Sequence, residues 1–148
     1  MSAANFENLC TGFCELARVP SPELGADGDG MLAFHVDWHG VTVNVIYLPS
    51  QAREHAFVMF DLGDAQGQPL DEVLILRALL RANFMALQPN PPCFACHPLS
   101  GAVVLQCVFP VLDAAPAGLL TLIDEGVTLA LQWREGFFID DTPTPPVA

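Results

Sequence analysis

The sequence contains no lysine, and its permanent cations are five arginines. Proteins that bind nucleic acids or anionic membranes do so through clustered cationic side chains, so neither is expected as a partner. Seventeen Asp and Glu residues give the 148-residue chain a formal net charge of −12 at pH 7. Charged residues nevertheless make up only 15% of the chain and hydrophobic residues make up 52%. The sequence therefore predicts an acidic protein that exposes apolar surface while its negative charge keeps it dispersed.

Signals for export or membrane insertion are also missing. The N-terminal segment MSAANFENLCTGFCELAR has neither the basic start nor the continuous apolar run of a secretory signal. The longest stretch without Asp, Glu, Lys or Arg, residues 82–112, is interrupted by five prolines and cannot form one membrane-spanning helix. We therefore expect a cytoplasmic protein whose five cysteines stay reduced.

The spacing of apolar residues predicts an α+β fold. Steps of three and four residues indicate helices, and strict alternation indicates strands, two of them joined by a tight turn at His39-Gly40. The predicted elements are, in chain order, a helix at 3–19, strands at 32–39, 41–47 and 56–62, a helix at 70–87, strands at 93–97 and 102–109, and a helix at 113–133. Strands grouped in hairpins indicate an antiparallel, twisted sheet of about five strands with three helices in the order α-βββ-α-ββ-α. We expect a single domain over 1–139, a loop at 25–30 and a disordered Pro-rich tail at 140–148.

The second predicted helix is apolar at nearly every position, and only Arg77 and Arg81 mark a polar line along it. A helix of this kind is buried on more than one side. It therefore favours a homodimer seam in addition to a face within the chain. The first helix and the three-stranded meander would then offer apolar grooves and a sheet edge to an extended peptide.

The segment Cys93-Phe-Ala-Cys96-His97 matches the C-x-x-C-H pattern of covalent haem attachment. Residues three apart on a strand point to opposite faces, so the two sulfur atoms should diverge. A structural zinc site needs a second pair of ligands, and Cys10, Cys14 and Cys107 do not form another C-x-x-C. We interpret the segment as a half-buried strand and keep a small metal- or haem-binding protein using Cys93, Cys96 and His97 as the alternative function.

Other candidate sites also have simpler interpretations. His35, Asp37 and His39 share one face of a predicted strand and could form a metal triad. Alternation with an apolar face explains the same residues as the solvent side of that strand. The sequence has no G-x-S-x-G elbow and no glycine-rich phosphate loop before a helix. We therefore expect no catalytic residues, no cofactor and no metal.

The element order, the size, the acidic balance and the segment Leu76-Arg-Ala-Leu-Leu-Arg-Ala-Asn-Phe84 resemble the class I type III secretion chaperones, the Tir-chaperone family. In that family a helix carrying L-x-x-L-L-x-A-N precedes two strands, and the last helix often ends near a tryptophan, here Trp133. The resemblance extends over residues 5–133. The C-x-x-C-H segment and the prolines at 89–92 depart from the family pattern.

The resemblance implies a non-enzymatic bacterial cytoplasmic homodimer. Such a protein binds the N-terminal chaperone-binding segment of a secreted effector in extended form, without ATP, and keeps the effector soluble and competent for secretion. The implied dimer interface consists of Leu76, Leu79, Leu80, Phe84 and Val104. The implied effector contacts are Phe6, Leu9, Phe13, Leu16, Phe34, Val36, Val43 and Val45. A subunit of a larger complex without a chaperone role would present the same surfaces.

Overall fold

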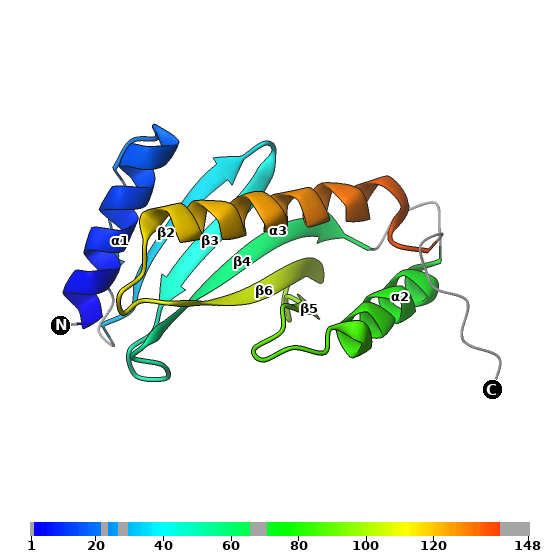
Figure 1. The fold of residues 1–148 in the computed structure, drawn as a ribbon. Helices are drawn as coiled ribbons and strands as arrows, with labels where there is room; N and C mark the ends of the chain where they lie inside the picture. Colours follow the sequence, from blue (N-terminus) through cyan, green and yellow to red (C-terminus); the bar gives the residue numbers. More distant parts are fainter. Residues whose placement is uncertain (1, 22–23, 27–29, 66–70, 140–148) are drawn as a thin grey trace.

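The structure, a computed structural model, describes residues 2–21, 24–26, 30–65 and 71–139, and the predicted tail at 140–148 lies outside them. The elements in chain order are α1 (Ser2–Ala17), β1 (Gly25–Ala26), β2 (Leu32–Trp38), β3 (Val41–Tyr47), β4 (His55–Asp64), α2 (Glu72–Met85), β5 (Cys93–Cys96), β6 (Ala102–Pro110) and α3 (Pro116–Gly136). Figure 1 shows their arrangement. The predicted α+β fold and the order of its helices and main strands are confirmed.

The strands form one sheet in the order β1-β2-β3-β4-β6-β5, and every neighbouring pair is antiparallel. The two-residue strand β1 adds to the five predicted strands and lies in the segment 25–30 that we expected to be a loop. It pairs Gly25 with Ala33 and Ala26 with Leu32. Two residues are too few to show a period of two, so this strand left no signal in the sequence.

The predicted turn between β2 and β3 is confirmed. His39 and Gly40 have φ values of 54° and 83°, and a two-residue hairpin loop with both residues at positive φ is the type I′ turn that matches the twist of the flanking strands. The Gly40 backbone N–H donates to Oδ1 of Asp37 at 3.1 Å. The turn sets the hairpin register, in which Trp38 pairs with Val41.

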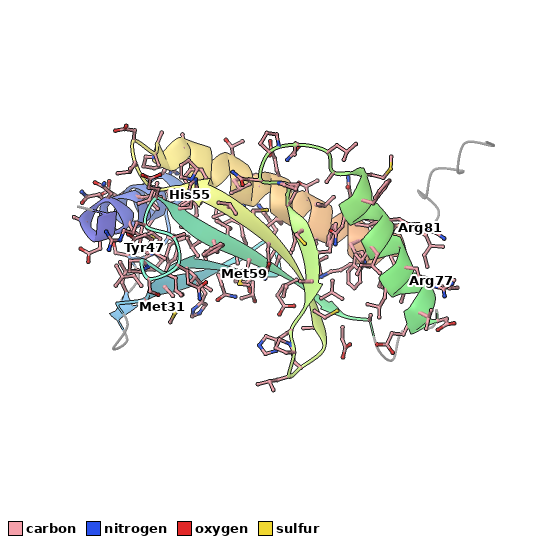
Figure 2. The ribbon with its side chains drawn as sticks, turned by 90° about the horizontal axis from the view of Figure 1, so that it is seen from below. Met31, Tyr47, His55, Met59, Arg77 and Arg81 are labelled. Atoms are coloured by element: carbon pink, nitrogen blue, oxygen red, sulfur yellow. The ribbon has the colours of Figure 1, made fainter. Side chains whose placement is uncertain are left out.

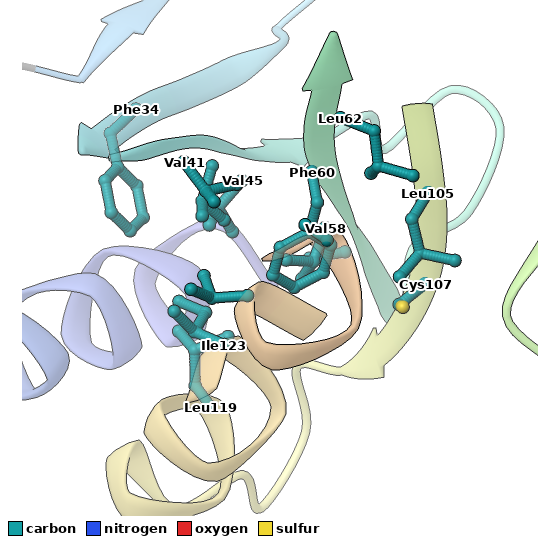
Figure 3. Close-up of a cluster of buried hydrophobic side chains, with 14 of the residues drawn as sticks. Phe34, Val41, Val45, Val58, Phe60, Leu62, Leu105, Cys107, Leu119 and Ile123 are labelled. Atoms are coloured by element: carbon teal, nitrogen blue, oxygen red, sulfur yellow. The ribbon is translucent and has the colours of Figure 1, made fainter. Parts of the chain in front are cut away.

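The helices α1 and α3 cover one face of the sheet, and the core lies between them and the strands (Figure 1). Every second strand residue points into this core, as Val45, Val58 and Leu105 do (Figure 3). From α3, Leu119 and Ile123 meet them. The other face of the sheet carries Met59 and His55 (Figure 2). Alternation along the strands thus divides the sheet into a helix-covered face and an open face.

Polar contacts also fix α3 against the sheet. Trp38 Nε1 donates to Oδ1 of Asp124 at 2.7 Å. The guanidinium of Arg134 donates to the backbone carbonyl oxygens of Leu62 (2.9 Å), Gly40 (3.0 Å) and Asp61 (3.0 Å). The last turns of α3 are therefore tied to the β2–β3 turn and to the end of β4.

The ends of the first and last helices differ from their predicted positions for local reasons. Arg18 has φ 59°, so α1 ends at Ala17 rather than at 19. Asp113 has φ 54° and cannot belong to a helix, whereas Pro116 occupies the first turn of α3, where its missing N–H costs nothing. The helix α3 then continues past Trp133 to Gly136.

Helix α2 begins after Asp71, whose side chain accepts a hydrogen bond from the Val73 N–H at 3.0 Å. The helix lies beside β5, at the end of the sheet far from α1 (Figure 1). It buries only Ile75, Ala78 and Leu79. Within one chain the helix is thus buried on one side, which is the face within the chain that the sequence predicts, and the expected second buried side would need a second copy. None of the described helices is long and apolar enough to span a bilayer.

Candidate partner-binding surfaces

A pocket of about 320 Å³ lies where the C-terminal end of α1 meets β2. The chain leaves α1 through Arg18, and the Val19 N–H bonds back to the Cys14 carbonyl at 3.0 Å, which folds the following residues over the strand. The pocket is lined by Cys14, Val19, Pro20, Ser21, Phe34, His35 and Val36. Most of these side chains are apolar, so the pocket suits an apolar side chain of a partner.

The α1 side of the pocket wall is uncharged. Burial raises the pKa of the Cys14 thiol, which therefore stays protonated at neutral pH. Phe34 packs against Phe13, with ring centroids 6.1 Å apart, and is held in place by the core beneath it. Next to the pocket, Leu16 is 49% exposed on the last turn of α1.

The edge of the sheet next to the pocket is open. In the part of the chain that the structure describes, β1 pairs only with Leu32 and Ala33, so the rest of β2, residues 34–38, has no strand partner on that side. An unpaired strand edge can accept an added strand through its backbone N–H and C=O groups. The pocket and the open edge share Phe34, His35 and Val36, so one extended peptide could use both.

The structure places most of the effector contacts that the family resemblance implies in the core of the single chain. Six of these eight residues lie in the core at no more than 6% exposure, namely Phe6, Leu9, Phe13, Phe34, Val43 and Val45. These side chains hold α1 to the sheet, as the stacking of Phe6 on Tyr47 at 5.3 Å illustrates. A partner cannot cover them without opening the core, apart from the part of Phe34 that lines the pocket. Leu16 and the half-buried Val36 remain accessible.

A second candidate surface lies on α2. We define the α2 apolar face as its five exposed hydrophobic residues, which are between 51% and 78% exposed: Val73, Leu74, Leu80, Phe84 and Met85. Arg77 and Arg81 lie on the same exposed side of the helix, turned away from the sheet (Figure 2). Five exposed hydrophobic side chains on one helix make this face a candidate interaction surface.

The residues expected at a dimer interface divide between this surface and the interior. Leu80 and Phe84 belong to the α2 apolar face, and Leu76 on α2 and Val104 on β6 are half-buried. Leu79 is only 4% exposed and packs within its own chain. The exposed face also includes Val73, Leu74 and Met85, which the sequence-based interface does not contain. Their hydrophobic character is evident in the sequence. In a helix that is apolar on all sides, however, the sequence does not indicate which side packs on the chain's own sheet.

The C-x-x-C-H segment does not gather its ligands. Cys93 and Cys96 are exposed at the two ends of β5, and their positions three residues apart place them on opposite faces of the sheet. Nδ1 of His97 accepts hydrogen bonds from the backbone N–H groups of Leu99 and Ser100, both at 3.2 Å, and so shapes the β5–β6 turn. Among the described residues, no three His, Cys, Asp or Glu side chains stand close enough to hold a metal ion.

The comparison with solved structures identifies the fold. One chain of a structure described as the ExsC-ExsE complex matches with a TM-score of 0.69 and 20% identity, over 91% of this chain and 95% of that one. One chain of the HopA1-SchA chaperone-effector complex matches with a TM-score of 0.64 and 17% identity, over 92% and 98%. One chain of the ExoT-SpcS complex from Pseudomonas aeruginosa matches with a TM-score of 0.57 and 14% identity, over 86% and 96%. No curated protein matches the chain.

The comparison with protein families covers the same elements. The Tir chaperone protein (CesT) family matches residues 7–134, which extend from the first turns of α1 almost to the end of α3. This span includes the pocket at α1 and β2, the open edge of β2 and the α2 apolar face. The chain belongs to the Tir chaperone protein (CesT) family.

Proposed function

We propose that the protein is a non-enzymatic chaperone of type III secretion that acts as a homodimer in the bacterial cytoplasm. It binds the N-terminal chaperone-binding segment of a secreted effector in extended form and keeps the effector soluble and competent for secretion. The observation that carries this proposal is the family match over residues 7–134. The similarity of the fold to a chain of a chaperone-effector complex supports it.

The effector segment would bind along β2. Its backbone would add to the open edge at residues 34–38, and an apolar side chain would enter the pocket beside Val36 and Leu16. Burial of apolar surface contributes about 25 cal/mol per Å², and the ordering of a flexible segment offsets part of this gain. A peptide held in this way is extended, since the strand edge accepts only extended backbone.

The α2 apolar face would form the seam between two copies. Leu80 and Phe84 are 66% and 78% exposed in the single chain, so they are free to contact an identical face across a two-fold axis. Leu76 and Val104 would flank this contact. Contact with a second copy would bury this face. The helix would then be buried on two sides, as its apolar composition predicts.

The test starts with the purified protein as bait in a lysate of the bacterium that produces it, followed by mass spectrometry of the captured proteins. The N-terminal segment of the captured protein is then titrated with wild type and with Leu16→Glu. A carboxylate at position 16 would have to be desolvated beside the pocket, and we expect at least about tenfold weaker binding. Leu131→Glu on α3, where Leu131 is 38% exposed, is the matched control and should bind as wild type.

Two results would contradict the proposal. The captured protein could bind with unchanged affinity after removal of its N-terminal segment, which would separate the interaction from secretion. Alternatively, an absorption spectrum and metal analysis of the purified protein could show stoichiometric haem or zinc, which would favour the alternative centred on Cys93, Cys96 and His97.

A further inference from the structure

The side chain of Asn83 on α2 makes two hydrogen bonds to one residue of β5. The Phe94 backbone N–H donates to Asn83 Oδ1 at 2.8 Å, and Asn83 Nδ2 donates to the Phe94 carbonyl oxygen at 3.1 Å. A carboxamide offers one acceptor and a donor side by side, as a peptide group does. Asn83 therefore occupies the place that a residue of a neighbouring strand would take.

This contact lies on the outer edge of the sheet. The strand β5 is the last strand in the order and pairs only with β6 within the described sheet. Both backbone polar groups of Phe94 are directed to Asn83, so they point away from β6. The strand β5 has only four residues. When the N–H and C=O of one outward-facing residue are already bonded, little of the edge is left to which another chain could add a strand.

The same contact is the polar link that orients α2. The helix buries only three of its residues, whereas the five residues of the α2 apolar face are exposed. Packing of three apolar side chains allows a helix to slide or rotate at little cost, because hydrophobic contact is not directional. Two hydrogen bonds to one backbone position fix both the rotation of the helix about its axis and its position along that axis relative to β5.

We propose that Asn83 is a positioning residue for the homodimer: its paired hydrogen bonds to the Phe94 backbone hold α2 on the edge of β5 so that the α2 apolar face is presented to a second copy, and they close that edge to strand addition. The inference rests on the proposed function, since it assumes the seam on α2. Asn83 acts through the orientation of the helix and not through contact with the partner.

The experiment measures the dimer dissociation constant by sedimentation and the hydrogen exchange of the Phe94 amide by NMR, in the full chain. Asn83→Ala removes both hydrogen bonds. We expect the dissociation constant to rise at least about tenfold and the exchange of the Phe94 amide to accelerate by a similar factor, while the Val58 and Phe60 amides in β4 keep their protection. Asn83→Asp retains the acceptor for the Phe94 N–H and loses the donor. Its dissociation constant and its Phe94 exchange rate should therefore lie between those of wild type and Asn83→Ala.

Gln88→Ala is the matched control, because Gln88 is an exposed carboxamide five positions further along the chain. It should leave both quantities unchanged. A dimeric wild type whose dissociation constant is the same in Asn83→Ala would overturn the inference and leave the proposed dimer intact. A wild type that sediments as a monomer at every concentration would instead overturn the seam itself, and the positioning role with it.

Discussion

The five cysteines differ in reactivity according to their place in the fold. Cys10, Cys14 and Cys107 are buried, and burial is the main cause that raises the pKa of each thiol. Cys93 and Cys96 are exposed on β5. Since the thiolate is the reactive form, an alkylating reagent at neutral pH should label Cys93 and Cys96 in the folded protein and all five cysteines after denaturation. Peptide mass spectrometry measures this, and labelling of Cys107 as fast as Cys93 would show that the core is open.

The buried thiols also predict how stability depends on pH. Burial, reinforced by the charge of Glu125, raises the pKa of Cys107 from its ordinary value of 9.0 to about 11. Between these values the unfolded chain has released the proton and the folded chain retains it, so the free energy of unfolding falls as pH rises. Cys107→Ala lacks this contribution. We expect urea unfolding to show that the advantage of wild type over Cys107→Ala shrinks by about 2 kcal/mol from about pH 8.5 to about pH 11. A constant difference would contradict the pKa shift.

At the scale of the elements, the packing of α3 on the sheet depends on a glycine inside the helix. Gly126 is buried, and a Cβ atom at this position would collide with the ring of Phe60, which is fully buried on β4. Alanine is favoured over glycine in a helix by about 1 kcal/mol. Here the collision outweighs that gain, because overpacking a rigid core costs roughly 1–3 kcal/mol. Gly126→Ala should therefore lower the unfolding free energy measured in urea.

Two control variants separate the collision from an effect on the helix itself. Gly136→Ala, at the C-terminal end of α3, has open space around the added atom and should not destabilise the protein through a clash. Phe60→Leu makes room on the sheet side, so Gly126→Ala should cost less in that background than in wild type. A Gly126→Ala protein as stable as wild type would mean that the helix can shift away from β4.

Helices and strands in which apolar residues recur at a regular spacing could be predicted from the sequence. What each of these elements packs against could not. The period of two located β3 at Val41–Tyr47 without error, and the glycine after His39 located the turn before it. The strand β1 is too short to show a period. Apolar periodicity identifies the side of an element that avoids water, but it does not distinguish a side buried in the chain from one that binds a partner. The effector contacts that the family resemblance implies include Phe6 and Val43, and both side chains lie in the core of the single chain.

The geometry of the candidate site likewise could not be predicted from the sequence. The pocket depends on the left-handed Arg18, which ends α1 and turns Val19 and Pro20 over β2. In the sequence, Pro20 and Pro22 indicate the end of the first helix, but a sequence pattern does not tell how the chain continues in space. The double hydrogen bond of Asn83 links residues eleven positions apart on two elements, and only the fold brings them together.

At the scale of the whole molecule, the structure shows where the many hydrophobic residues of the sequence lie. One part forms the core between the sheet and the helices α1 and α3, and another part is exposed on α2. The formal charge of −12 makes two copies repel each other. Association therefore requires a patch where apolar contact outweighs this repulsion, and we propose the α2 apolar face, with Arg77 and Arg81 on the same exposed side, as that patch.

Leu80→Asp tests this arrangement because Leu80 is 66% exposed in the single chain. The variant chain should fold as wild type does, since its carboxylate is hydrated in the monomer. In the seam the same carboxylate would be buried without a partner, at a cost of several kcal/mol, in addition to repulsion from a second acidic chain. Sedimentation should show a monomer with an unchanged circular dichroism spectrum. Leu112→Asp, at a leucine that is 45% exposed between β6 and α3, adds the same charge away from α2 and should remain dimeric. If both variants dimerise as wild type does, the seam lies elsewhere, and the exposed face of α2 must serve a different partner.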